Sequence, residues 1–170
     1  MTQAPELTVA QWFNTPRDLK LADMRGKVVV IEAFQMLCPG CILHGIPLAQ
    51  SVQRMFSPEQ VAVIGLHTVF EHHQAMTPVS LQAFLHEFRV TFPVAVDAPG
   101  PGGMPLTMAA YQMRGTPSLL IIDQRGALRA HHFGQVSNLQ LGAEIASLCA
   151  CETMWRPPKG AQVLGSGSTA

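Results

Sequence analysis

The chain has 170 residues, of which 48% are hydrophobic and 13% are charged, a composition typical of one globular domain with its own core. Acidic and basic residues balance at 11 each, which argues against a nucleic-acid-binding protein because such a protein carries a basic patch or stripe. No apolar run approaches the roughly 20 residues that cross a bilayer, and the first residues lack the pattern of a signal peptide. We therefore expect no membrane segment and a cytoplasmic location, although a leader trimmed from the natural protein would make it periplasmic.

The first third of the chain predicts a buried strand followed by a helix. Residues 7–13 and 19–21 are expected to be short extended pieces. The segment from Lys27 to Phe34 is rich in β-branched residues and does not alternate, which indicates a strand buried on both faces. Residues 41–56 have helical spacing, and Pro47 inside them predicts a kink.

The remainder alternates strands with helices and ends in a hairpin. We expect a strand at 61–70, a helix at 79–90, a short strand at 92–97 and a short helix at 106–113. The segment 115–134 reads as two strands around a turn at 124–126, and Ser137 is the candidate N-cap of the last helix. This order predicts a βαβ core with an antiparallel hairpin, in one domain over residues 1–156 with a flexible tail over 157–170.

Two cysteines directly follow the first buried strand, with Pro39 and Gly40 between them. A C-x-x-C pair beside a βαβ pattern is typical of a redox motif. Free N–H groups at the start of a helix favour the thiolate of Cys38, and Cys41, one turn later, can resolve a mixed disulfide. By itself the pair also fits half of a metal site or a packed structural pair.

Two other features favour the redox interpretation. Glu32 lies inside the apolar run, where a charge is costly unless it is paired or protonated, so it is a candidate proton carrier. The alternative is that it meets solvent at a sheet edge or pairs with Lys27 or an arginine. Thr116 and Pro117 stand just before a buried strand, and a cis bond there would present the Thr116 backbone to an extended substrate. An ordinary trans turn is the alternative.

With these three motifs the sequence resembles the thioredoxin-fold thiol–disulfide oxidoreductases, most closely the TlpA-like group of the redoxin, or AhpC-TSA, superfamily. The segments that carry the resemblance are "LADMRGKVVVIEAFQMLCPGC" and "RGTPSLLIID", within about residues 5–150. The resemblance implies a three-layer α/β/α sandwich with a mixed central sheet, an N-terminal extension and a central βα insertion. It also implies that Glu32 is a buried acid and that Thr116 and Pro117 lie against the cysteines.

The sequence departs from this group at two positions beside the cysteines. Leu37 stands where the group usually has Trp, and His44 stands where some relatives carry an acid. His44 could tune the acidity of the thiols, or it could be a solvated helix residue. The loop after the second strand should end near Cys38, and it offers a substrate rim, although a merely exposed polar loop is the favoured interpretation; its residues are Thr68, Glu71, His72 and His73.

Three other functions compete with disulfide exchange. A peroxidase of the peroxiredoxin type needs Thr and Pro where this chain has Gln35 and Ile31. A zinc site would use Cys38 and Cys41 with the distant pair Cys149 and Cys151, a poor spacing for zinc. Cys149 itself continues an apolar helix stripe, which favours core packing, and a second redox pair with Cys151 is the lesser alternative. A thioredoxin-fold interaction protein without turnover is the third.

The sequence thus predicts a thiol–disulfide oxidoreductase, with reduction favoured over oxidation, that needs no cofactor and no metal. Its partners should be a disulfide-containing protein or small thiol substrate and an electron donor that the sequence does not identify. The catalytic residues should be Cys38, Cys41 and Glu32. The residues expected to contact substrate are Thr116, Pro117, Leu37, Pro39, Gly40 and His44.

Overall fold

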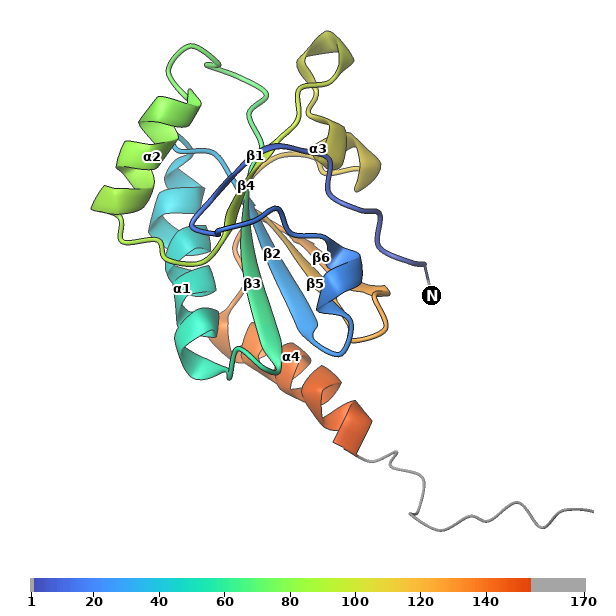
Figure 1. Ribbon diagram of the computed structural model, residues 1–170. Coiled ribbons are helices and arrows are strands. Elements are labelled where there is room, and N and C mark those ends of the chain that lie inside the picture. The colour runs from blue at the N-terminus through green and yellow to red at the C-terminus, as the bar shows by residue number, and fades with distance from the viewer. Residues whose placement is uncertain (1, 154–170) are drawn as a thin grey trace, which may run out of the picture.

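The computed structural model describes residues 2–153, with the side chains of residues 2–150, and places one mixed sheet at the centre of these residues (Figure 1). The strand order is β1-β4-β3-β2-β5-β6. The strands are β1 (Val9–Phe13), β2 (Val28–Phe34), β3 (Val61–His67), β4 (Val94–Asp97), β5 (Ser118–Ile122) and β6 (Leu128–Phe133).

The predicted strand from Lys27 to Phe34 is confirmed as β2, and all seven of its residues are buried. It pairs in parallel with β3 and antiparallel with β5. β4 continues the parallel part, while β1 and β6 form antiparallel edges. A strand with neighbours on both sides and helices over both faces has no solvent-facing residues, which explains why its sequence is apolar without alternation.

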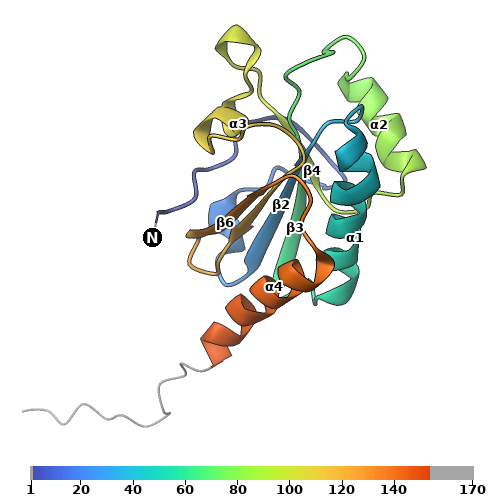
Figure 2. The ribbon, with the colours of Figure 1, turned by 180° about the vertical axis from the view of Figure 1, so that it is seen from behind.

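Helices cover the two faces of the sheet unequally. One face packs against three long helices: α1 (Ile46–Met55), α2 (Pro78–Glu87) and α4 (Asn138–Thr153). The other face is covered by the short α3 (Leu106–Ala110), the 3₁₀ turn η1 (Leu21–Met24) and the N-terminal segment. Figure 2 shows the arrangement from behind, with α1 beside α2 and the short α3 across the sheet from them. The expected three-layer α/β/α sandwich is therefore confirmed.

The helix that carries the cysteines begins irregularly. The turn η2 (Cys41–Gly45) is of the π type, in which the Ile46 N–H donates to the carbonyl of Cys41, and α1 continues from it. Pro47 therefore lies inside a helical run that is already formed at residues 39–45, and without an N–H it cannot donate a hydrogen bond to the preceding turn. The wide turn η2 comes directly before Pro47, where the sequence predicted a kink.

One predicted element is only partly right, and one cap is confirmed. Residues 19–21 were expected to be extended, and Lys20 is, but a 3₁₀ turn begins at Leu21, where the Glu6 carboxylate accepts the N–H groups of Leu21 and Ala22 at 3.1 Å each. Ser137 caps α4 as predicted, since its hydroxyl accepts the Gln140 N–H at 3.1 Å. The predicted tail at 157–170 lies outside the described residues.

Candidate active site

Cys38 lies at the junction between the end of β2 and the first turn of the following helix. Its N–H donates to the carbonyl of Gln35 at 3.2 Å, which closes the turn that leads out of the strand. Its sulfur accepts the Cys41 N–H at 3.3 Å. A thiolate at this position therefore has a helix N–H aimed at it, as the sequence predicted.

The two thiols differ in exposure. Cys38 is half-buried, whereas Cys41 is fully buried, and both are free thiols in this structure. Burial is the main cause that raises the pKa of the Cys41 thiol, and its interaction with Cys38 raises it further. The arrangement suits an accessible attacking sulfur and a protected second sulfur that stays protonated until it is needed.

Glu32 lies beneath this pair in the middle of β2, opposite Gly65 of β3 and Leu119 of β5. Its side chain is 1% exposed, and its Oε1 atom has no hydrogen-bond partner among the described residues. The edge position and the ion pair considered from the sequence are both wrong. Burial raises the pKa of Glu32 well above its ordinary value, and the nearby charge of Cys38 adds to this effect.

Two glycines allow the helix to pack closely on Glu32 and on the loop before β5. A Cβ atom on Gly45 would collide with Glu32 Oε1, and it would also come within 3.3 Å of Pro117. A Cβ atom on Gly40 would lie 3.2 Å from the Pro117 ring. Pro117 is therefore wedged against the first turns of the helix, above the buried carboxyl group.

The Thr116–Pro117 peptide bond is cis, the geometry that the sequence suggested. The Thr116 carbonyl faces the active site, where it accepts the Cys38 S–H at 3.5 Å. Both residues are half-buried, so part of the loop's surface stays open. The structure thus brings Cys38, Cys41, Glu32 and this loop together from three separate parts of the chain.

The other predicted substrate contacts surround this centre. Leu37 is 57% exposed, and Pro39 and His44 are exposed as well. His44 lines a shallow cavity of about 230 Å³ together with Leu43 and Val136. Leu37 and Pro39 adjoin Cys38 in the chain and offer exposed apolar side chains beside it, whereas no hydrogen bond or ion pair among the described residues assigns His44 a role.

The predicted rim after β3 is only partly right. Thr68 is fully buried, and its hydroxyl donates to Asp97 at 3.0 Å, so it is part of the core rather than the rim. Glu71, His72 and His73 are exposed. The loop is fixed to the active-site strand because the Thr68 N–H donates to the Phe34 carbonyl at 3.1 Å.

Gln35 is a site residue that the sequence interpretation missed. It is 1% exposed, and its amide oxygen accepts the Phe70 N–H at 3.2 Å. Its amide nitrogen donates to Glu71 Oε1, also at 3.2 Å. An uncharged polar residue directly after a buried strand was the available signal, and it was considered only as a departure from the peroxidase pattern.

The remaining cysteines and histidines lie outside this group. Cys149 is half-buried against the core, as predicted, and burial raises its pKa. The side chain of Cys151 lies outside the described residues. His132 contacts Glu144 of α4 at 2.8 Å. Among the described residues, no three His, Cys, Asp or Glu side chains gather as metal ligands would.

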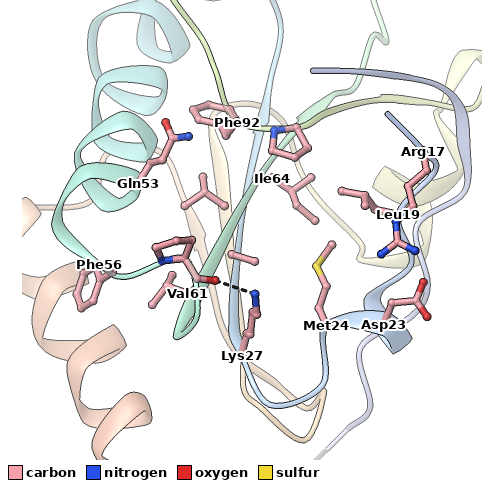
Figure 3. Close-up of a pocket in the computed structure, with 14 residues that line it drawn as sticks. Arg17, Leu19, Asp23, Met24, Lys27, Gln53, Phe56, Val61, Ile64 and Phe92 are labelled. Carbon is pink, nitrogen blue, oxygen red and sulfur yellow. Dashed lines mark hydrogen bonds between the residues drawn. The ribbon is translucent and has the colours of Figure 1, made fainter. Parts of the chain in front are cut away.

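A cavity of about 320 Å³ lies away from the cysteines, at the start of β3 (Figure 3). β4 pairs with only the last three residues of β3, Gly65–His67. The first half of β3 therefore has no strand on that side, and its residues line the cavity. Arg17, Lys27 and Gln53 surround it, and Lys27 Nζ donates to the Pro58 carbonyl at 2.8 Å (Figure 3). None of the residues that line this cavity is a candidate active-site residue.

Solved structures of related proteins match most of the chain. A thioredoxin-like superfamily protein is 71% identical, with a TM-score of 0.86 over 88% of this chain and 97% of that one. A thiol-disulfide isomerase from Corynebacterium glutamicum is 51% identical, with a TM-score of 0.83 over 86% of this chain and 97% of that one.

Curated relatives are longer. Protein DipZ from Mycobacterium tuberculosis is 29% identical over 78% of this chain, which spans only 18% of DipZ.

No helix among residues 2–153 is long and apolar enough to cross a membrane.

A family model matches most of the sequence as well. It is that of the AhpC/TSA family, and it covers residues 1–131. Together with the structural matches, which share the sheet and the helices described above, this shows that the chain belongs to the AhpC/TSA family and has a thioredoxin-like fold.

Proposed function

We propose that the protein is a thiol–disulfide oxidoreductase that reduces disulfides through Cys38 and Cys41. The observation that supports this most is the position of Cys38: a half-buried sulfur that accepts the Cys41 N–H and lies 3.5 Å from the Thr116 carbonyl. This sulfur is open to a substrate, while its partner sulfur is buried one helical turn away. The 51% identity to a protein described as a thiol-disulfide isomerase supports the same class of reaction.

In the proposed reaction, the Cys38 thiolate attacks one sulfur of a substrate disulfide and the other sulfur leaves as a thiolate. Cys41 then loses its proton and attacks the Cys38 sulfur, which releases the second substrate thiol. Two electrons pass to the substrate, and the enzyme is left with a Cys38–Cys41 disulfide. A dithiol donor, whose identity is not defined, returns two electrons to restore the thiols.

Glu32 is the proposed acceptor of the Cys41 proton. A buried carboxylate with a raised pKa is a stronger base than an ordinary glutamate, and no donor among the described residues binds Oε1. The substrate backbone would lie along the Thr116–Pro117 loop, with Leu37, Pro39 and Gly40 beside the scissile bond. His44 belongs to the same surface in this proposal.

The direct test is the reduction of insulin disulfides with dithiothreitol as donor, comparing the wild-type protein with Cys38→Ser and Cys149→Ser. We expect Cys38→Ser to abolish the catalysed rate and Cys149→Ser to keep it. Cys149 follows Leu148, whose carbonyl accepts a hydrogen bond from Gln124 in the turn after β5, at the opposite end of β5 from Pro117. An unchanged rate in Cys38→Ser would contradict the mechanism. The reduction potential of the wild-type pair against glutathione then decides whether reduction or oxidation is the favoured direction.

Hydrogen peroxide distinguishes the peroxidase alternative. Gln35 is buried and engaged with the loop after β3, so it does not replace the threonine that the peroxidase pattern requires. We therefore expect the thiols to be lost slowly at micromolar peroxide. Rapid loss that depends on Cys38 would instead make peroxide the substrate.

A further inference from the structure

Glu71 and Arg114, which carry opposite charges and form no ion pairs among the described residues, lie on opposite sides of Cys38. β2 delivers Cys38 and lies between β3 and β5 in the sheet. Glu71 follows β3, and Arg114 comes shortly before β5. The strand order therefore places the carboxylate and the guanidinium on the two flanks of the attacking sulfur.

The acidic flank is held by Gln35. The carbonyl of this residue binds the Cys38 N–H, while its buried amide binds both the Phe70 N–H and the Glu71 carboxylate. Two hydrogen bonds through a single residue thus connect the Glu71 carboxylate to the backbone of Cys38. No basic side chain among residues 2–150 forms an ion pair with Glu71.

The basic flank is held by Phe133. The guanidinium carbon of Arg114 lies 5.0 Å from the centre of the Phe133 ring, a cation–π contact. The same ring closes against Gly115, where a Cβ atom would lie only 3.1 Å from it. Thr116, the next residue, contacts the Cys38 sulfur. Among the described residues Arg114 forms no ion pair with an acidic side chain. Burial lowers the pKa of His131, and the charges of His132 and Arg114 lower it further.

We propose that Glu71 and Arg114 are specificity-determining residues, which favour disulfide substrates with a cationic group on the β3 flank and an anionic group on the β5 flank. Gln35 is the positioning residue that keeps the Glu71 carboxylate in place. This inference rests on the proposed function, since it selects among disulfides for the same sulfur. Both side chains are exposed, so their charges act on the substrate through a screened field, and each one changes selectivity by a modest factor.

The test measures the reactivity of Cys38 toward charged reagents and needs no turnover. Two methanethiosulfonates serve as probes, one with a trimethylammonium group and one with a sulfonate group. The thiolate attacks the sulfenyl sulfur of either reagent, forms a mixed disulfide and releases methanesulfinate. A Cys41→Ser background prevents resolution, and mass spectrometry of peptides separates Cys38 from the other cysteines.

The readout is the ratio of the cationic to the anionic rate at low ionic strength. We expect Glu71→Gln to lower this ratio about two- to fivefold and Arg114→Gln to raise it by a similar factor. Gln35→Leu should lower this ratio as much as Glu71→Gln does. In the double variant Gln35→Leu/Glu71→Gln the ratio should be no lower than in Glu71→Gln alone. Both effects should shrink in 0.5 M NaCl. Uncharged methyl methanethiosulfonate reports any change in Cys38 itself.

Two control variants, Glu59→Gln and Arg54→Gln, each remove a charge of the same sign at a position far from the cysteines. Glu59 lies in the turn before β3, and Arg54 lies in the last turn of α1. If Glu71→Gln and Arg114→Gln change the ratio no more than these controls do, the proposal is wrong. That result would leave the insulin assay unaffected, whereas loss of insulin reduction with an intact charge ratio would contradict the proposed function alone.

Discussion

At the scale of single residues, Glu32 is a buried carboxylic acid in an apolar setting. It occupies the middle of a fully buried strand, with one carboxylate oxygen lacking a partner among the described residues. A structural role would be better served by an apolar residue, since an unpaired buried polar group is destabilising. The cost is explained if the group transfers a proton during the reaction.

We predict that Glu32→Gln slows disulfide reduction at least about tenfold at neutral pH, because glutamine cannot accept the Cys41 proton. Rapid-mixing kinetics should place the loss in the resolution of the mixed disulfide rather than in the first attack by Cys38. A slower first attack by Cys38, with an unchanged rate of resolution, would contradict this role and would mean that Glu32 acts on Cys38. Glu59→Gln, at an exposed position, is the control for the same chemical change.

Gly45 provides the space that Glu32 occupies. A side chain at this position would overlap Oε1, so we predict that Gly45→Ala lowers the free energy of unfolding by about 1–3 kcal/mol. The shorter side chain in Glu32→Asp should relieve most of this loss. The two single variants and the double variant form a cycle measured by denaturant unfolding. Independent, additive effects would show that the contact does not matter.

At the scale of elements, Asp97 at the end of β4 joins three segments. Its carboxylate accepts the N–H groups of Thr107 and Met108 at 2.8 and 2.9 Å, which caps α3, and it also accepts the Thr68 hydroxyl at 3.0 Å. The end of β3, and with it the loop that leads to Glu71, is therefore fixed to α3. This explains why Thr68 is a structural residue.

We predict that Asp97→Ala destabilises the protein by about 3 kcal/mol or more, because it leaves three buried donors without an acceptor. Thermal or urea unfolding measures the change, and Asp18→Ala, at an exposed position, should change it little. Asp97→Asn keeps the shape and one acceptor oxygen, so it should cost less than alanine. Equal losses in the two Asp97 variants would contradict the hydrogen-bond explanation.

At the scale of the whole molecule, two buried titratable groups give stability opposite dependences on pH. Burial raises the pKa of Glu32 and lowers the pKa of His67 from 6.5 to about 4. The contribution of Glu32 to the free energy of unfolding is complete below pH 4.5 and is lost as pH rises through its raised pKa. The contribution of His67 to the same free energy is complete above pH 6.5 and is lost as pH falls through about 4.

We therefore predict that His67→Leu reduces the loss of stability between pH 6.5 and pH 4. The two pKa values imply a contribution of about 3 kcal/mol, at 1.36 kcal/mol per pH unit. His67 packs against Phe34 with ring centres 5.3 Å apart, and its Nε2 atom has no partner among the described residues, so leucine suits the site. Urea titrations across this range, with His73→Gln as an exposed control, measure the effect. Parallel pH curves for wild type and His67→Leu would contradict it.

Family membership and the thioredoxin-like fold follow from the matches over most of the chain. The cytoplasmic location stays a prediction, and cell fractionation with an antibody to the protein tests it.

Local patterns in the sequence determined most of the elements and pointed to the pair of cysteines that we propose as reactive. The apolar β-branched run predicted β2, the helical spacing predicted α1 and α2, and the C-x-x-C motif after a buried strand identified the cysteines. These signals are readable because burial on both faces, helical periodicity and the start of a helix depend on neighbouring residues. The departure at Leu21 arose where Glu6, distant in sequence, capped the backbone.

Only the tertiary structure decided which distant residues complete the site. Glu32 could have paired with a cation or met solvent, and its isolation followed from the strands on both sides and from the absence of a Cβ atom at Gly45. The roles of Gln35 and Thr68 likewise depend on the parallel pairing that brings the ends of β2 and β3 to one edge. Hydrogen bonds between segments more than 25 residues apart leave no periodic signal, because each depends on the position of the whole sheet.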